Sequence, residues 1–381
     1  MPPTAFFDRF DIPNDDDDQD DAIDNESVLD LALSVFRPAR ELRWHYRSRH
    51  ESLITFSNKH FYDSKLVVFP SPLPRHDDYG VEYCPVEGLY TPKAGINLLE
   101  AREVAKAAEA FMMSYPQRSL GIVTLNQAQR EVLTKEMDRL FAHNEQAEAY
   151  RKRWEDTLEP FFVKNLENVQ GDERDVVFIS TVYGPEQRGN RVAQRFGPIN
   201  AAAGHRRLNV LFTRAKEKVI IFSSMTPEDI VPTEMSRLGV GILKYYLAYA
   251  RDRRLEFGVA SGREPDSDFE VFVADRLRLH GFEVVPQVGV AGYFIDLAVR
   301  DSRNRDYYLL GIECDGAAYH SAKSARDRDR LRQEILERMG WNIYRIWSTD
   351  WFSDPEREME KLLRHIRGLS ESSPLARLLP G

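Results

Sequence analysis

The chain has 381 residues, of which 42% are hydrophobic, and this length predicts two or three globular domains. Its two cysteines, Cys84 and Cys314, exclude a disulfide framework or a cysteine-based zinc site and predict a reducing, cytoplasmic location. No apolar run approaches the ~20 residues of a membrane span and no signal peptide opens the chain, so we expect no membrane partner. The net charge is −9.

That net charge comes from one segment. Residues 11–26, DIPNDDDDQDDAIDNE, hold nine of the 61 acidic residues, and the remaining 52 equal the 52 basic residues elsewhere. A block of like charges repels itself and buries little apolar surface, so the pattern predicts a disordered loop. Local basic patches elsewhere stay compatible with nucleic-acid binding.

Residues 27–225 alternate apolar runs with amphipathic segments. Helices are expected at 27–36, at 97–116, from about 127, and at 206–215. Strands are expected at 65–72, 119–126, 175–184 and 218–224. Alternation of this kind predicts an α/β domain with a mainly parallel sheet that helices cover on both faces.

The pattern changes after residue 225. One more helix at 235–251 and a Gly/Pro/Ser-containing stretch occupy residues 226–265, which we interpret as a helix and linker. A smaller α/β domain is expected at 266–370. Its predicted elements are a helix at 269–282, strands at 293–301 and 307–316, a helix at 324–340, a strand at 342–348 and a helix at 356–369.

In the first domain, polar residues border the buried strands. LRWHYRSRH, SLGIVTLNQAQ, ENVQGDERDVVFIS and RRLNVLFTRAK each place charged or amide side chains where α/β proteins put ligand chemistry. Arginine suits such a site because it bridges phosphate oxygens. Taken singly, each stretch is equally typical of a solvated turn or a surface arginine.

Together these stretches resemble the second RecA-like motor domain of superfamily 1 helicases, over residues 1–225. HYRSRH is similar to motif IV, VQGDERD to motif V and RRLNVLFTRAK to motif VI. The resemblance implies that Arg47 and Arg214 contact the γ-phosphate of ATP and that Gln170 and Glu173 contribute nucleotide and coupling contacts. It further implies that Arg207 supports motif VI. Thr124 and Asn126 would lie near the nucleic-acid track.

One part of that machinery has no counterpart in the sequence. There is no G-x-x-x-x-G-K-[ST] stretch, and no glycine precedes a lysine anywhere in the chain. Such a loop supplies the backbone N–H groups and the lysine that hold the phosphates. We therefore expect ATP to act as a cofactor only where a first motor domain is supplied, by a separate chain or a further segment, and we interpret the motor domain as truncated at its N-terminus.

In the second domain, two strands carry carboxylates among apolar neighbours. Asp296 lies in YFIDLAV, and Glu313 and Asp315 lie two apart, on one face of LLGIECD. Burying carboxylates side by side is costly unless a cation neutralises them, and Mg²⁺ takes oxygen ligands of this kind; ordinary edge-strand acids are the alternative. His320 would act as a general acid or base, and Glu270 on the opening helix would be a fourth acid.

The helix at 324–340 has two distinct sides. Leu331, Ile335 and Met339 form its expected core stripe. The opposite side carries a candidate phosphate-contacting set: Arg326, Arg330 and Gln333. An ordinary salt-bridged helix is the alternative, because acidic residues are interleaved with the arginines.

ECDGAAYH, RDRDRLR and GWNIYRIWSTDWF resemble the PD-(D/E)XK restriction-endonuclease-like fold, in the variety related to very short patch repair endonucleases. The resemblance implies hydrolysis of DNA phosphodiesters with Mg²⁺ or Mn²⁺. Asp296 and Glu313 would hold the metal, with Asp315, His320 and Glu270 assisting. The usual lysine position carries Asp315, so either His320 substitutes for the lysine or the activity is weak.

The sequence therefore predicts the C-terminal part of a helicase–nuclease that processes DNA, as in bacterial repair or defence systems. A non-catalytic DNA-binding module is one alternative. A helicase fragment that works only with a separate first motor domain is another. DNA and RNA remain equally compatible with the charge pattern outside the acidic block.

Overall fold

A computed structural model of the chain describes residues 32, 33, 36, 38–73, 78–252, 264–290, 292–315 and 323–372. The residues form two compact units. Unit 1 comprises Met1–Leu42 and Val81–Arg253, and unit 2 comprises Arg43–Gly80 and Arg254–Gly381. The predicted acidic loop at 11–26, most of the helix predicted at 27–36 and most of the predicted linker lie outside the described residues.

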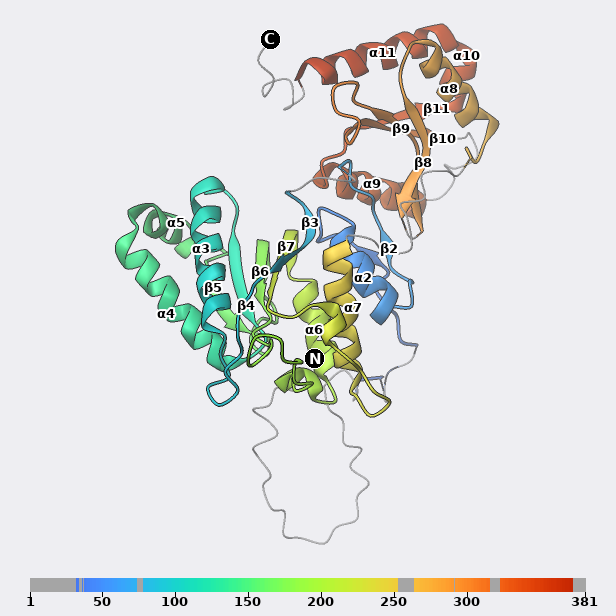
Figure 1. The fold of residues 1–381 in the computed structure, drawn as a ribbon. Helices are drawn as coiled ribbons and strands as arrows, with labels where there is room; N and C mark the ends of the chain where they lie inside the picture. The colour runs from blue at the N-terminus through green and yellow to red at the C-terminus, as the bar shows by residue number, and fades with distance from the viewer. Residues whose placement is uncertain are drawn as a thin grey trace. The chain divides into compact units, whose positions relative to one another are not determined.

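Unit 1 is built on a five-stranded sheet in the order β3-β7-β6-β4-β5 (Figure 1). Its strands are β3 (Gly80–Pro85), β4 (Leu120–Thr124), β5 (Phe162–Asn165), β6 (Arg174–Ser180) and β7 (Ala215–Ser223). β4 pairs in parallel with β5 and β6, and β6 pairs in parallel with β7. Every residue of β4 and β6 is buried, as expected for central strands covered on both faces. The predicted α/β class is therefore confirmed.

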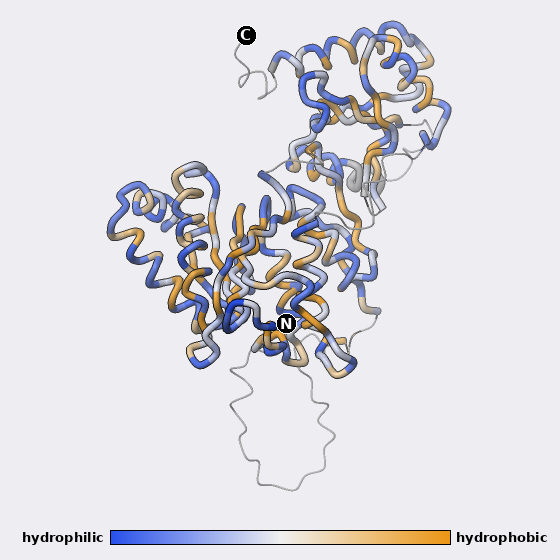
Figure 2. The backbone as a smooth tube through the Cα atoms, viewed as in Figure 1, coloured by the Kyte–Doolittle hydropathy of each residue, from blue (hydrophilic) through white to orange (hydrophobic). Residues whose placement is uncertain are grey.

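Helices flank both faces of this sheet. They are α3 (Leu98–Ser114), α4 (Gln127–His143), α5 (Glu145–Glu155), α6 (Gly204–Phe212) and α7 (Leu238–Asp252), with short 3-10 helices at Gly197–Asn200 and Pro227–Asp229. In Figure 1, α3, α4 and α5 lie on one side of the sheet and α6 and α7 on the other. Figure 2 shows hydrophobic residues alternating with hydrophilic ones along α3 and α4, and the hydrophobic ones pack on the sheet.

The long apolar and amphipathic segments predicted in unit 1 coincide with α3, α4, α7, β4, β6 and β7. The sequence did not predict β3, β5 or α5. β5 has four residues, including Lys164 and Asn165, and α5 reads EQAEAYRKRWE, so neither has a clear apolar pattern. The helix predicted at 206–215 ends at Phe212, because Thr213 is its C-cap and β7 begins at Ala215.

A fully buried acid joins α3 to the carboxyl ends of β6 and β7. Glu100 Oε1 accepts hydrogen bonds from the Ser180 hydroxyl and from the Val182 N–H, both at 2.7 Å, and Oε2 accepts one from the Ser224 hydroxyl at 2.8 Å. Val182 has φ of 71°, a left-handed conformation that β-branched residues rarely adopt. Burial raises the pKa of Glu100 to about 7, although the three hydrogen bonds oppose that rise.

We expect Glu100→Gln to stabilise the protein at pH 8 and to leave its stability at pH 5 close to that of the parent. Between the ordinary pKa of 4.5 and about 7, native Glu100 keeps a proton that the unfolded chain has released. The free energy of unfolding therefore falls as the pH rises through this window. A neutral amide of the same shape removes the loss, which is about 2–3 kcal/mol at pH 8. Urea unfolding at both pH values measures the effect.

The matched control is Glu131→Gln on the exposed side of α4, which makes the same charge change at the surface. We expect this variant to keep the parent's stability at both pH values, because the exposed Glu131 side chain packs against little of the protein. If Glu100→Gln and the parent have the same free energy of unfolding at both pH values, Glu100 does not hold a proton near neutral pH.

Unit 2 contains a four-stranded sheet in the order β11-β10-β9-β8. Its strands are β8 (Val284–Val290), β9 (Tyr293–Arg300), β10 (Tyr308–Asp315) and β11 (Ile343–Trp347). β9 pairs antiparallel with β8 and β10, and β10 pairs in parallel with β11. The sequence predicted β9, β10 and β11 but missed β8. Pro286 and Gly289 interrupt the apolar run of β8, as is typical of an edge strand.

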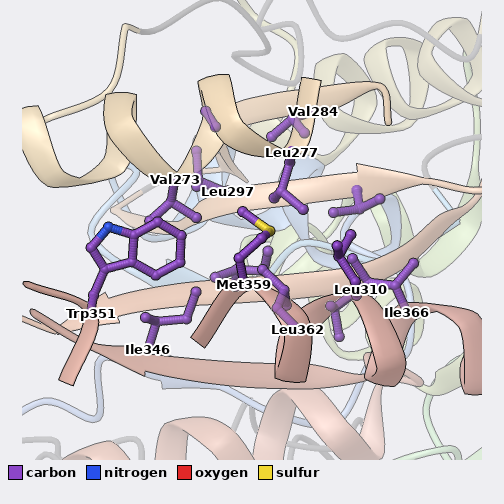
Figure 3. Packing of buried hydrophobic residues seen from close by; sticks show 14 of the residues in the cluster. Val273, Leu277, Val284, Leu297, Leu310, Ile346, Trp351, Met359, Leu362 and Ile366 are labelled. Atoms are coloured by element: carbon purple, nitrogen blue, oxygen red, sulfur yellow. The ribbon is translucent and has the colours of Figure 1, made fainter. Parts of the chain in front are cut away.

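One face of this sheet is covered by three helices. They are α8 (Asp268–Leu279), α10 (Ser348–Ser353) and α11 (Pro355–Ser372). Figure 3 shows the hydrophobic core between these helices and the strands. The labelled core residues are Val273, Leu277, Val284, Leu297, Leu310, Ile346, Trp351, Met359, Leu362 and Ile366.

The other face packs against α9 (Lys323–Arg338) and the segment 43–80. This segment contains β1 (Trp44–His45), α2 (Ser52–Phe61) and β2 (Val67–Val68), and β1 and β2 pair in parallel. Phe69 is buried in a core with Tyr293 and Trp341, and the Trp341 indole donates a hydrogen bond to the Pro70 carbonyl at 2.9 Å. The sequence-based division assigned 43–80 to the first domain, whereas in the structure these apolar contacts place it in unit 2.

Among the helices of the described residues, none combines the length with the apolar composition that crossing a membrane requires.

Candidate active site

Five acidic residues of unit 2 line one cavity of about 420 Å³: Asp266, which lies just before α8, and four more from three elements. Glu270 comes from the first turn of α8, Asp296 from β9, and Glu313 and Asp315 from β10. The structure thus brings together four of the five residues predicted to be catalytic. The fifth, His320, lies outside the described residues.

Asp296 is held by the neighbouring strand. Its Oδ2 accepts a hydrogen bond from the backbone N–H of Cys314 at 2.7 Å. Burial, and secondly the charge of Glu313, raise the pKa of Asp296 to about 8. A cation in the cavity would favour the ionised carboxylate, because it would offset both the burial and the repulsion.

Glu313 is oriented by a tyrosine. The Tyr293 hydroxyl donates a hydrogen bond to Glu313 Oε1 at 2.8 Å. Burial raises the pKa of Glu313, while the hydrogen bond from Tyr293 and the charge of Arg345 act in the opposite direction. Asp296 and Glu313 are therefore both carboxyl groups whose charge the protein surroundings only partly offset.

Asp315 stands where the resemblance places a lysine, and it forms an ion pair. Arg345 Nε lies 3.0 Å from Asp315 Oδ2. Arg345 reaches the cavity because β11 pairs in parallel with β10, with Glu313 opposite Arg345. The sequence pattern does not distinguish Arg345 from other strand residues. The one feature that could have indicated Arg345 is its place in the predicted strand NIYRIWS, which pairs with the strand that carries Glu313 and Asp315.

Glu270 has both carboxylate oxygens engaged at the start of α8. Oε1 accepts a hydrogen bond from the Ser267 hydroxyl at 2.8 Å, and Oε2 accepts from the Asp266 N–H at 3.0 Å and from the Gln287 amide at 2.8 Å. In return, Ser267 caps the helix by accepting from the Glu270 N–H. This reciprocal arrangement fixes the helix start, which places Glu270 at the cavity.

The donors in this cavity have the chemistry of a hard-cation site. All five acids offer oxygen ligands, which Mg²⁺ and Mn²⁺ prefer. Within the described residues, however, no three His, Cys, Asp or Glu side chains stand close enough to form a complete metal site. The arrangement therefore fits an ion held by one or two carboxylates and completed by water or substrate, as is usual for Mg²⁺.

The predicted phosphate-contacting face of α9 is only partly at the cavity. Gln333 lines the cavity, whereas Arg330 is exposed and pairs with Glu334 at 2.9 Å. The side chain of Arg326 lies outside the described residues. The predicted core stripe is also wrong at one position: Leu331 is 48% exposed, and Leu336 is buried in its place. This change in helix phase turns Arg332 into the cavity, where the sequence analysis did not expect it.

In unit 1, Arg214 lies beside the loop that holds Gln170 and Glu173. The Arg214 guanidinium donates to the Asp172 carbonyl at 3.3 Å and to the Val210 carbonyl at 2.7 Å. Gln170 is exposed and Glu173 is half-buried. Both precede β6, and Arg214 precedes the parallel strand β7, so these predicted nucleotide contacts gather at the amino-terminal edge of the sheet.

Arg207 and Arg47 lie on other elements. Arg207 lies in the first half of α6, buried, with Nη1 3.7 Å from Glu167 Oε1. The prediction that Arg207 and Arg214 share one helix is therefore wrong, since α6 ends before Arg214. Arg47 belongs to unit 2, between β1 and α2. Together with burial, which is the larger cause, its charge lowers the pKa of His45 to about 4.

Thr124 and Asn126 lie at the carboxyl end of β4. Thr124 is fully buried and donates a hydrogen bond to the Asn126 carbonyl at 2.6 Å. The Asn126 side chain caps α4 by accepting from the Gln129 N–H at 2.8 Å. Both residues therefore have a structural role, and their contact with nucleic acid stays a prediction.

Two curated relatives are similar along most of the chain. The uncharacterized ATP-dependent helicase MG140 homolog of Mycoplasma pneumoniae is 26% identical over 387 residues, which cover 95% of this chain and 33% of the relative. The uncharacterized ATP-dependent helicase MG140 of Mycoplasma genitalium is 28% identical over 357 residues, 90% of this chain and 31% of the relative. The chain thus spans about a third of the length of these relatives.

The C-terminal domain of a possible DNA helicase from Lactobacillus plantarum WCFS1 aligns with 53% of this chain and 96% of its own, at 14% identity and a TM-score of 0.26, a value too low to bear on the fold. Two family models also match. REase_MTES_1575 matches residues 269–366, the part of unit 2 that carries the acidic cavity. AAA_12, described as an AAA domain, matches residues 25–226, which is more than half of the chain, and the chain therefore belongs to the AAA_12 family.

Proposed function

We propose that unit 2 is a metal-dependent DNA endonuclease of the PD-(D/E)XK type, joined to the second motor domain of a superfamily 1 helicase. The observation that carries the proposal is the convergence of four carboxylates from α8, β9 and β10 on one cavity. The match of this region to REase_MTES_1575 supports it. The two relatives are named as ATP-dependent helicases, which supports nucleic acid as the substrate.

In this proposal Asp296 and Glu313 hold Mg²⁺ or Mn²⁺. The ion, when bound, would lower the pKa of a water molecule and offset negative charge on the phosphate. The Cys314 N–H and the Tyr293 hydroxyl orient the two carboxylates, as their hydrogen bonds of 2.7 Å and 2.8 Å indicate. Fixing the ligands in this way reduces the reorganisation that binding would otherwise require.

The reaction is hydrolysis of one phosphate ester bond. The oxygen of water bonds to phosphorus, one P–O ester bond breaks, and the leaving oxygen takes up a proton while the attacking water loses one. Asp315 is held by Arg345 at 3.0 Å and does not offer the positive charge of a lysine. His320 stays the predicted proton-transfer residue, and DNA is the predicted partner.

For the motor half, we propose that Arg214, Gln170 and Glu173 contribute to a nucleotide site that a first motor domain completes. Arg47 and Arg207 keep their predicted roles at that site. The sequence contains no glycine–lysine pair to hold the phosphates, so these 381 residues alone should not turn over ATP. ATP hydrolysis by the purified chain would contradict this part of the proposal.

The test is cleavage of supercoiled plasmid by the purified chain. We expect nicked product with Mg²⁺ or Mn²⁺ and none with EDTA, since the carboxylates alone cannot activate water. Glu313→Gln should lower the rate by roughly 10²-fold, because it replaces a charged metal ligand with a neutral amide. Equal cleavage with EDTA, or by Glu313→Gln, would exclude this site. A chain that binds DNA without any cleavage would favour the alternative of a non-catalytic DNA-binding module.

A further inference from the structure

Arg332 lies at the wall of the acidic cavity although nothing in the sequence pattern distinguishes it from its neighbours on α9. Its side chain is half-buried and lines the cavity together with Asp296 and Glu313. Two aromatic rings flank the guanidinium: its central carbon lies 5.7 Å from the centre of the Tyr293 ring and 5.8 Å from that of Trp44. Contacts of this length are attractive between a cation and a ring.

The two rings are themselves fixed by the segment 43–80. Phe69, buried in the core, lies 5.8 Å from Trp44 in an edge-to-face contact and 4.8 Å from Tyr293. Next along the chain, the Pro70 carbonyl accepts the hydrogen bond from the Trp341 indole. The region that the AAA_12 match covers therefore packs behind two residues of the cavity wall, Tyr293 and Arg332.

The charge of Arg332 acts on one of the two predicted metal-binding acids, Glu313. It lies near enough to Glu313 and Tyr293 to lower the pKa of each, against the larger effect of burial. Arg345 also lines the cavity, where it forms an ion pair with Asp315 at 3.0 Å. A planar guanidinium is suited to phosphate, because its parallel N–H groups match two oxygens.

We propose that Arg332 contacts the phosphate of the DNA strand in the cavity and stabilises the negative charge that develops there, and that Trp44 is a positioning residue for Arg332. This inference rests on the proposed nuclease function and specifies how the site binds its substrate. It assigns to Arg332 the positive charge that the residue pattern lacks at Asp315. It also makes the segment 43–80 necessary for cleavage.

The first test measures binding without metal, by fluorescence anisotropy of a short DNA duplex in EDTA at several salt concentrations. We expect Arg332→Gln to weaken binding and to reduce the slope of log affinity against log salt by about 1, the value for one lost phosphate contact. With Mg²⁺, the same variant should lower kcat by roughly 10²-fold. The salt slope and kcat of Arg332→Lys should lie between those of the parent and those of Arg332→Gln, because lysine keeps the charge and loses the planar fork.

The matched control is Arg338→Gln, which removes the same charge from an exposed position of the same helix. It should retain the salt dependence and the cleavage rate of the parent. If Arg332→Gln keeps the parent's salt slope and kcat, the inference is overturned. If Asp296→Asn cleaves like the parent while Arg332→Gln still lowers the salt slope, the proposed catalytic site fails and the phosphate contact stands.

Trp44 is tested by a double-mutant cycle. We expect Trp44→Ala to lower kcat by about tenfold and Trp44→Phe, which keeps a ring, to stay close to the parent. In the Arg332→Gln background, Trp44→Ala should cause no further loss, because its effect passes through the guanidinium. An equal loss in both backgrounds would show that Trp44 supports only the fold and would overturn its positioning role.

Discussion

Asp296→Asn should lower the cleavage rate by roughly 10³-fold and at the same time make unit 2 more stable at neutral and alkaline pH. The loss of activity follows because the amide carries no charge for a metal ion. The gain in stability follows from the cavity itself, where burial and Glu313 raise the pKa of Asp296 from 3.8 to about 8. The Cys314 N–H keeps an acceptor, since the asparagine side chain also carries an oxygen.

The sign of the pH dependence follows from proton binding. Between pH 3.8 and about 8, native Asp296 holds a proton that the unfolded chain has released, so the free energy of unfolding falls as the pH rises. The amide of Asp296→Asn does not titrate and has no such loss. The variant should therefore match the parent near pH 4 and exceed it by about 2–4 kcal/mol at pH 8, after allowance for partial exposure.

Urea unfolding followed by tryptophan fluorescence suits this measurement, because four of the five tryptophans belong to unit 2. Adding Mg²⁺ should stabilise the parent and leave Asp296→Asn unchanged, since an ion that binds only the native state raises its stability. A variant that cleaves like the parent, or one that Mg²⁺ stabilises equally, would remove Asp296 from the site.

Asp301→Asn, which changes an acid just beyond the end of the same strand, provides the opposite control. Asp301 is buried outside the cavity and accepts hydrogen bonds from Arg303 at 2.9 Å and 3.1 Å. Burial alone would raise the pKa of Asp301, but the bonds from Arg303 lower it. Its ionised form therefore stabilises the fold above the ordinary pKa of 3.8, and the variant should be less stable at pH 7 while cleavage is retained.

Trp351→Ala should destabilise unit 2 by about 3–5 kcal/mol, the usual result of removing a large buried ring. The Trp351 side chain is fully buried and packs with Phe269 at 6.2 Å in the core that Figure 3 shows. Truncation would leave a void between α8, α10 and the sheet. Urea unfolding should show unit 2 losing structure at lower denaturant concentration, with unit 1 much less affected.

Two further variants test whether the loss of stability comes from removing the buried ring. Trp351→Phe should cost less than half as much, because it keeps a ring and because the indole N–H finds no hydrogen-bond partner within the described residues. Phe352→Ala changes the next residue, which is 63% exposed, and should cost less than about 1 kcal/mol. Equal losses from Trp351→Ala and Phe352→Ala would contradict the burial argument.

The parts of the fold that the sequence predicts are those with strong local patterns. β4, β6 and β7 carry continuous apolar runs, and Glu313 and Asp315 share a strand face because side chains alternate along a strand. These acids share one cavity with Asp296 because β9, which carries Asp296, pairs with β10. Edge strand β8 was missed because Pro286 breaks its apolar run.

What the sequence did not predict depends on contacts between distant residues. No local pattern brings Trp44 to Arg332, and the indole of Trp341 meets the carbonyl of Pro70 across 271 positions of the chain. The rotation of α9 about its axis was also misjudged, because Leu331 and Leu336 are equally apolar and only the packed structure selects Leu336. Arg332 and Arg345 were missed for these reasons.

The long separation between Pro70 and Trp341 also has a consequence for folding. Unit 2 is discontinuous, since residues 81–253 of unit 1 are inserted between its two segments. Its sheet and α9 are encoded after residue 253, so a chain emerging from the ribosome can complete most of unit 1 before unit 2 can close. Contacts between such distant segments slow folding, because a long loop must be ordered first. Trp44 and Phe69 would lack their unit 2 packing partners during that interval, which leaves their apolar surface open to chaperones.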